Sequence, residues 1–268
     1  MKDIQNESAE CNDLSYGSYL QISKLLSLQK FQSPNMEHDE LLFIVIHQVY
    51  ELWFKQIIHE FSALKKNIAN NLDYKILFCL KRVRNILKVM VLQTDILETM
   101  GPVSFASFRK YLGKASGFQS FQFRLFEFIL GFKDERFLNN PDFTNKQRKA
   151  LETVFKESSI WLEFLSYFKN SIADNKSHEL FPHNTDLNND HRALIFIYLN
   201  PSIYTEIAEL VLDIDEGLQE WRYRHVKMVE RIIGVGKIGT GGSSGVEYLK
   251  KSLFKSFCPE LLEIRNHF

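Results

Sequence analysis

The 268-residue chain has few of the residues on which several classes of protein depend. Its three cysteines, Cys11, Cys79 and Cys258, form no C-x-x-C pair, which argues against a disulfide framework and against a cysteine-ligated zinc or iron–sulfur site. Acidic and basic residues number 33 each, so no overall basic charge attracts nucleic acid or an anionic membrane. The longest apolar run, LLFIVI at 41–46, is too short to span a bilayer, and the polar N-terminus shows no export signal. We therefore expect a cytoplasmic protein with no nucleic-acid or membrane partner.

Strand patterns and internal repeats are absent, whereas helical patterns are abundant. Apolar residues recur at spacings of three and four, and the six prolines lie between or at the ends of the segments that show this period. These segments are 38–68, 74–100, 104–112, 118–131, 144–169, 203–233 and 245–256. Most of the 23 phenylalanines are expected in the core. The sequence predicts an all-α single domain over 1–268, with an N-terminal arm and first helix at 1–33, a polar loop at 174–190 and a small helical excursion at about 138–175.

Half of the twelve glycines lie in one stretch, GVGKIGTGGSSG at 234–245. The P-loop template argues against a phosphate site, because it requires a lysine after its glycines, whereas Lys237 precedes the main group of glycines here. A dinucleotide fold is also disfavoured, because its glycines follow a strand and these follow a predicted helix. Two interpretations stay open at this point, a mobile linker and a loop that folds over a bound ligand.

Two histidines in the segment HELFPH, His178 and His183, do not form a zinc motif. Their spacing is five residues instead of four, and Pro182 interrupts the helix that would align them. This segment is expected to be a surface loop.

His47 lies on a predicted helix one turn after Phe43, on the same side. Positions 47, 51, 55 and 59 are His, Glu, Lys and His, which form a polar stripe along this helix. The stripe is compatible with a solvated face that contains a Glu51–Lys55 pair, and equally with a histidine that lines an aromatic-accepting pocket.

His225 follows Trp221 by one helical turn and is followed by Met228, Val229 and Ile232 at spacings of three and four. A neutral imidazole backed by apolar side chains is suited to ligate a haem iron, although an ordinary core histidine has the same surroundings.

Arg109 shares a narrow helical stripe with Phe105, Leu112 and Ser116. Such an arginine either extends its charge to solvent, pairs with an internal acid, or clamps a substrate carboxylate through two hydrogen bonds.

Four segments, in this order, resemble the tryptophan 2,3-dioxygenases, the haem enzymes that open the indole ring of L-tryptophan with O2. They are FIVIHQVYELWFKQ, ILETMGPVSFASFRKYLGKASGFQSFQFR, WRYRHVKMVERIIG and GTGGSSGVEYLKK. The resemblance runs from SYGSYLQISKLL near residue 15 to about residue 250 and is weakest between 132 and 200. It implies an oxidoreductase of the kynurenine pathway of tryptophan catabolism, a dioxygenase that uses haem b and O2 to convert L-tryptophan into N-formyl-L-kynurenine. Two alternatives are a related dioxygenase with broader specificity for indoleamines and a non-catalytic helical haem protein.

The resemblance also implies a role for individual residues. His225 matches the proximal ligand of the haem iron, and His47 matches the distal histidine that hydrogen-bonds the indole N–H. Arg109 matches the arginine that binds the substrate carboxylate. The other matched positions line the substrate pocket or contact the substrate: Phe43, Phe105, Leu112, Ser116 and Thr240. Thr240 lies in the glycine-rich loop, which is implied to close over bound tryptophan.

The N-terminal tyrosines Tyr16 and Tyr19 match residues that reach the pocket of a neighbouring subunit in a homotetramer. One departure from the family pattern is an apparent extra residue between His225 and Thr240, which affects the reach of Thr240. The amphipathic pattern that begins at SYGSYLQISKLL is typical of an arm that docks on another surface, and also of a first helix packed on its own subunit.

Overall fold

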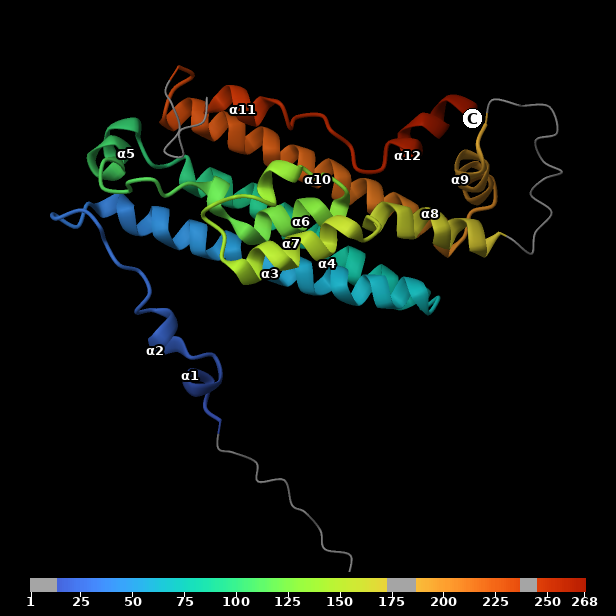
Figure 1. Cartoon of the computed structure of the whole chain (residues 1–268), viewed down its shortest axis with the longest axis horizontal. Helices are drawn as coiled ribbons and strands as arrows, with labels where there is room; N and C mark the ends of the chain where they lie inside the picture. The colour runs from blue at the N-terminus through green and yellow to red at the C-terminus, as the bar shows by residue number, and fades with distance from the viewer. Residues whose placement is uncertain (1–13, 173–186, 237–244) are drawn as a thin grey trace, which may run out of the picture.

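Three long helices lie side by side and form the body of the molecule (Figure 1). The structure is a computed structural model, and it describes residues 14–172, 187–236 and 245–268. The long helices are α3 (His38–Ala69), α4 (Asp73–Leu97) and α10 (Ile203–Ile232), and α4 packs on both of the others. The described residues contain no β-strand. The all-α prediction is confirmed.

The ends of these helices follow from local chemistry. The side chain of Ser202 accepts a hydrogen bond from the backbone N–H of Tyr204 and forms a capping box with Thr205, which satisfies amide groups that have no partner within the first turn of α10. Acidic residues, Asp39 and Glu40, lie in the first turn of α3, where the helix dipole favours negative charge.

Shorter helices cover the body or lie at its two ends (Figure 1). They are α1 (Tyr16–Tyr19), α2 (Ile22–Leu25), α5 (Pro102–Arg109), α6 (Phe121–Leu130), α7 (Asn145–Lys156), α8 (Ile160–Ser171), α9 (Asn189–Leu199), α11 (Val246–Lys250) and α12 (Pro259–Glu263), with the 3-10 turns η1 (Gly117–Gln119), η2 (Glu135–Phe137) and η4 (Ile264–His267). α5 and α11 lie at the end of the body where α3 begins and α10 ends, and α12 lies toward the opposite end.

Three predicted helices differ from the structure. The segment 144–169 is two helices, because the side chain of Ser159 caps a new helix through the backbone N–H of Leu162. The predicted helix 104–112 ends at Arg109, and the predicted helix 245–256 ends at Lys250. The α9 helix was not predicted from the sequence; it begins at a cap in which the Asn188 side chain accepts from the backbone N–H of His191. Of the loop expected at 174–190, residues 174–186 lie outside the described residues and 189–190 belong to α9.

Phenylalanine dominates the core, as the composition predicts. The largest side chains that are fully buried include six phenylalanines, at positions 61, 108, 126, 128, 164 and 168. The ring of Phe61 stacks on that of Phe126 at 5.9 Å, which joins α3 to α6. Burial of such rings contributes about 1.5–3 kcal/mol each, so the core supplies much of the stability of the fold.

The segment at 138–175 contributes to two apolar clusters. Leu151 of α7 packs with Phe128 and Phe143 in a small cluster of their own. Phe164 and Phe168 of α8 belong instead to the main core. The division of the chain into a main domain and a helical excursion stays a prediction.

The α3 helix is long enough and apolar enough to span a bilayer, with a mean hydropathy of 1.3 over its most apolar 18 residues. This length and composition are also found in core helices of proteins that never enter a membrane. α3 packs against α4, α6 and α8 and buries Phe54, Ile57, Phe61 and Leu64 against them. We interpret α3 as a core helix.

A buried group of charges joins two of the helices to the chain after α11. Glu127 of α6 accepts a hydrogen bond from Arg124 of the same helix, and its other oxygen lies 2.9 Å from Nη2 of Arg222 on α10. All three side chains are less than a tenth exposed. Arg222 also donates to the carbonyl of Ser252, just after α11, at 3.4 Å. This group fixes α6, α10 and the chain after α11 relative to one another.

Candidate active site

A second apolar cluster lies apart from the main core, at the end of the body that carries α5. Its buried members are Ile46, Leu97, Met100, Phe105, Phe108, Met228 and Ile232, and Leu42, Phe43, Tyr50, Leu112, Val229 and Ile233 pack against it. These residues come from α3, the end of α4, α5 with the turn after it, and the end of α10. The fold therefore gathers residues from three of the four segments that the sequence singled out separately.

His47 of α3 lines a recess at this end of the body. Its ring is exposed to solvent, yet its pKa is lowered by the surrounding protein, while the Phe43 carbonyl and the charge of Glu51 only partly oppose that shift. The two observations agree if the ring is deep in the molecule but faces an open space. Nδ1 lies 2.7 Å from the Phe43 carbonyl oxygen, which can only accept, so Nδ1 carries the proton. Nε2 is therefore a neutral hydrogen-bond acceptor.

His225 of α10 lies near His47. It is half-buried, and its pKa is lowered to about 4, first by burial and second by the electrostatic effect of His47. The second cause requires the two imidazoles to be near neighbours. At neutral pH both rings are uncharged, which leaves each with a nitrogen lone pair.

Trp221 supports His225 from one turn earlier on α10. The two rings are nearly parallel, at 16°, with centroids 5.8 Å apart. Three aromatic rings, of Tyr50, Phe54 and Phe123, hold the indole at centroid distances of 5.4–5.9 Å. The buried indole nitrogen has no hydrogen-bond partner among the described residues. The sequence showed Trp221 only as an apolar neighbour; its stacking on His225 follows from the helical turn between them.

Two arginines tie α10 to the end of α4 on either side of His225. Arg224 pairs with Asp95, and with Glu98 at 3.3 Å, while Arg231 pairs with Glu98 at 3.2 Å. The Glu98 side chain is largely buried, so these pairs are less screened by solvent than surface pairs. They hold in place the part of α10 that carries His225.

Three phenylalanines form an aromatic wall beside His47. The ring of Phe43 is 4.1 Å from that of His47, 5.8 Å from Phe105 and 5.6 Å from Phe108. Phe105 and Phe108 of α5 meet edge to face at 5.4 Å. The sequence did not single out Phe108, although its spacing of three from Phe105 places both rings on one side of a helix. The wall offers an apolar surface next to His47, whose Nε2 can accept a hydrogen bond.

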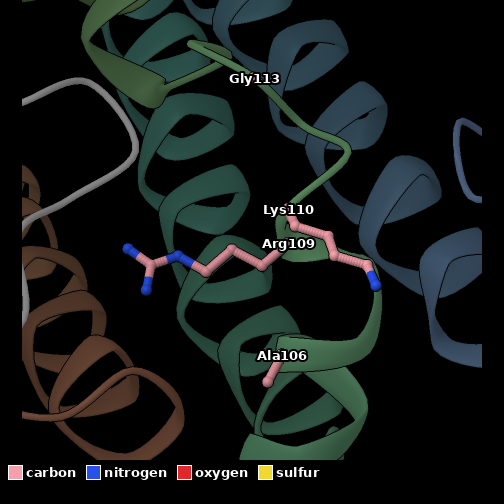
Figure 2. Close-up of a pocket in the computed structure, with 4 residues that line it drawn as sticks. All are labelled: Ala106, Arg109, Lys110 and Gly113. Atoms are coloured by element: carbon pink, nitrogen blue, oxygen red, sulfur yellow. The ribbon is translucent and has the colours of Figure 1, made fainter.

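Arg109 stands at the last residue of α5, beside this wall. Its guanidinium lies over the Phe105 ring at 5.9 Å. Figure 2 shows Arg109 and Lys110 extending in opposite directions from the end of the helix. An open hollow of about 430 Å³ is lined by Ala106, Arg109, Lys110 and Gly113. A planar, permanently charged donor beside an apolar wall is suited to bind a carboxylate group.

Leu112 and Ser116 do not extend the helical stripe of Arg109, because α5 ends before them. Leu112 nevertheless packs against the second apolar cluster. The Ser116 hydroxyl caps η1 by accepting from the backbone N–H of Phe118 at 3.4 Å. The ring of Phe118 in turn meets that of Tyr248 on α11 at 4.5 Å.

Three further predicted residues are not in this cluster. Tyr16 and Tyr19 lie on α1, which stands away from the body (Figure 1), and their side chains are 77% and 70% exposed. Thr240 lies outside the described residues, as do His178 and His183.

The side chains at this end of the body fit a haem group. A neutral imidazole is a common protein ligand of haem iron, and His225 offers one. Leu97, Met228 and Ile232 supply apolar surface next to it for a macrocycle. Within the described ranges, no three His, Cys, Asp or Glu side chains come together in a group that could hold a metal ion directly.

Comparison with known proteins identifies the family of the chain. The family model described as tryptophan 2,3-dioxygenase matches residues 2–161 and 165–268. A tryptophan 2,3-dioxygenase of Herpetosiphon aurantiacus is 45% identical over 259 residues, covering 94% of this chain and 97% of the relative. One of Anaeromyxobacter sp. (strain K) is 42% identical, covering 98% and 99% of the two chains, and one of Bacillus anthracis is 39% identical, covering 94% and 92%. With matches of this extent, the chain belongs to the tryptophan 2,3-dioxygenase family.

Proposed function

We propose that the protein is a tryptophan 2,3-dioxygenase, which inserts O2 across the C2–C3 bond of the indole ring of L-tryptophan to give N-formyl-L-kynurenine. The observation that carries the proposal is the pair of neutral imidazoles, His47 and His225, which lie near one another, with His47 beside an aromatic wall. One imidazole suits iron ligation and the other suits recognition of an indole N–H. Membership of the family supports the same reaction.

His225 would hold the iron of haem b, and Trp221 and the arginine pairs to α4 would keep its ring in position. Bound haem supplies the activation of O2, which amino-acid side chains do not provide. The protein contributes orientation, since fixing the indole against the reacting oxygen converts a bimolecular step into an intramolecular one.

His47 would accept the indole N–H at Nε2. Its Nδ1 proton is already committed to the Phe43 carbonyl, so the ring presents only its lone pair to the recess. The lowered pKa keeps this nitrogen unprotonated at neutral pH. Phe43, Phe105 and Leu112 would line the indole pocket, whose apolar surface excludes water from the reacting ring.

Arg109 would bind the carboxylate of the substrate and so select an amino acid over a simple indole amine. Its guanidinium lies over the Phe105 ring, which places the charge next to the aromatic wall. Ser116, at the cap of η1, and Thr240, in the glycine-rich loop, are proposed as further substrate contacts.

We further propose a homotetramer in which the N-terminal arm, of which residues 14–33 are described, completes the site of a neighbouring copy with Tyr16 and Tyr19. The arm exposes a row of large apolar side chains, Leu14, Tyr16, Tyr19, Leu20, Leu25, Leu26 and Leu28, and neither α1 nor α2 has a buried residue. α4 also exposes apolar residues, among them Phe78, Leu92 and Ile96. Apolar surface of this extent is costly in water and is typical of a surface that a second chain covers.

The test of the activity is spectroscopic and chemical. The purified protein, reconstituted with haem, is expected to show a haem absorbance spectrum that changes on reduction with dithionite. With L-tryptophan and O2 it is expected to release N-formyl-L-kynurenine, detected by mass. Haem binding without product would leave a non-catalytic haem protein, and preferred turnover of tryptamine would indicate a broader indoleamine dioxygenase. We also place the enzyme in the cytoplasm, and fractionation of cells that express it would test this.

A further inference from the structure

The last part of the N-terminal arm is fixed to α3 at two separate points. Gln32 and Ser33 contact Glu40, in the first turn of α3. Gln29 donates to the side chain of Gln48 at 2.5 Å, and Gln48 donates to the carbonyl of Leu28 at 3.3 Å. Residues 28–33 therefore run along the first turns of α3, the same turns that carry Phe43 and His47.

Glu40 is the stronger of the two attachments. It has no exposed surface, and its carboxylate accepts from the backbone N–H of Gln32 at 2.6 Å, from that of Ser33 at 3.1 Å and from the Ser33 hydroxyl. The Ser33 hydroxyl in turn accepts from the backbone N–H of Glu37 at 2.9 Å. Charge-assisted bonds of this kind are about twice as strong as neutral ones. A buried carboxylate with three donors and no adjacent cation in the described chain holds the backbone at 32–33 in one conformation.

The two attachment points fix the direction in which residues 28–33 run along α3. Glu40 and Gln48 are eight residues apart on α3, which corresponds to about 12 Å along the helix axis. Beyond the second point the arm leaves the body, and α1 and α2 stand clear of the other helices (Figure 1). Because those two helices bury nothing on their own chain, their own packing does not decide where they point.

We propose that Glu40 is a positioning residue that aims the arm of its own chain at the active site of another copy. The inference rests on the proposed exchange of arms. It adds that Glu40, by fixing the backbone at 32–33, sets the direction in which the arm leaves its own chain. It also explains why a carboxylate is buried at this point: three donors converge on it, and only a group that accepts on both oxygens satisfies them all.

The first test is the isosteric variant Glu40→Gln, with Asp39→Asn as the matched control. The glutamine amide group turns a donor toward one of the three donors, so the attachment fails without a change in side-chain size. Asp39 is in the same helical turn, and within the described part of the chain its side chain contacts His38, at 3.0 Å. We expect Glu40→Gln to bind haem normally but to lose about tenfold or more in kcat/KM for L-tryptophan. Asp39→Asn is expected to behave as the wild type.

The second test distinguishes misplacement of the arm from damage to the active site of the chain that carries Glu40→Gln. Glu40→Gln is dissociated, mixed with Arg109→Ala and reassembled; a parallel mixture pairs a chain lacking residues 1–20 with Arg109→Ala. In mixed oligomers, a site with Glu40→Gln keeps its Arg109 and receives an intact arm from the Arg109→Ala chain. We expect activity to return in both mixtures.

Each other result overturns the inference in a distinguishable way. Activity in the deletion mixture but not in the Glu40→Gln mixture would keep the shared site and reject Glu40 as its aiming residue. Wild-type kinetics of Glu40→Gln would reject it as well. Mixed oligomers with no activity in either mixture would refute the shared site itself. If Glu40→Gln does not fold, Ser33→Ala removes one of the three donors; a smaller loss that Arg109→Ala restores supports the proposal, and wild-type kinetics overturn it.

Discussion

Replacing His47 by leucine removes the acceptor for the indole N–H while keeping an apolar side chain of similar size in the recess. The substitution removes one specific hydrogen-bond acceptor. Nδ1 is hydrogen-bonded to the Phe43 carbonyl at 2.7 Å, so Nε2 is the nitrogen that remains for a ligand. Leucine also keeps water from taking the place of the ring. The indole N–H is then buried without a partner.

An unpaired donor in such a site costs about 1–3 kcal/mol. The variant should therefore bind L-tryptophan about 5- to 150-fold more weakly than the wild type. The shape of the pocket changes little, because Phe43, Phe105 and Phe108 pack on one another independently of His47.

The assay compares two ligands in spectroscopic titrations of the haem protein. One is L-tryptophan, and the other is its benzofuran analogue, which has oxygen in place of the N–H. The wild type is expected to prefer tryptophan, and His47→Leu is expected to bind the two about equally; the difference between the two preferences isolates the N–H bond. His59→Leu, an exposed position farther along α3, is the control.

An undiminished preference for tryptophan in His47→Leu would refute the reasoning, since the acceptor would then be another group. Loss of haem from this variant would mean instead that His47 is the iron ligand. The roles of the two histidines would then have to be exchanged.

Three further predictions concern the neighbouring groups. His225→Ala is expected to abolish tight haem binding while far-ultraviolet circular dichroism shows unchanged helical content; a normal haem spectrum would sink the assignment. Arg109→Ala should lower kcat/KM for L-tryptophan by a factor that corresponds to a loss of about 2–5 kcal/mol in transition-state stabilisation. The kcat/KM for tryptamine, which has no carboxylate, should not change. Equal losses in kcat/KM for the two substrates would contradict a carboxylate clamp. Glu127→Leu leaves Arg124 and Arg222 buried without their counter-charge, so urea unfolding should show a loss of about 3–5 kcal/mol in stability, and an unchanged midpoint would be evidence against this reasoning.

Much of the helical framework could be predicted from local sequence. The period of apolar residues predicts α3, α4 and α10 to within a few residues. A long stripe of apolar side chains with this period lies on one face only if the segment is helical, and that face then packs on the core. The break between α7 and α8 was missed, since the Ser159 cap competes with a helical period that continues across it. The end of α5 was misplaced for a similar reason: the stripe from Arg109 to Ser116 continues in the sequence but not in the helix.

The sequence by itself determined the chemistry available to this protein: a histidine beside an aromatic residue on α3, a second histidine backed by apolar residues on α10, and an arginine on an apolar stripe. Only the tertiary structure decided that these groups meet. Because α4 packs on both α3 and α10, it brings His47 and His225 near one another, and the surrounding protein keeps both imidazoles neutral. The attachment of the arm to Glu40 was equally hidden, because backbone donors and a convergence of hydrogen bonds leave no pattern in the order of side chains.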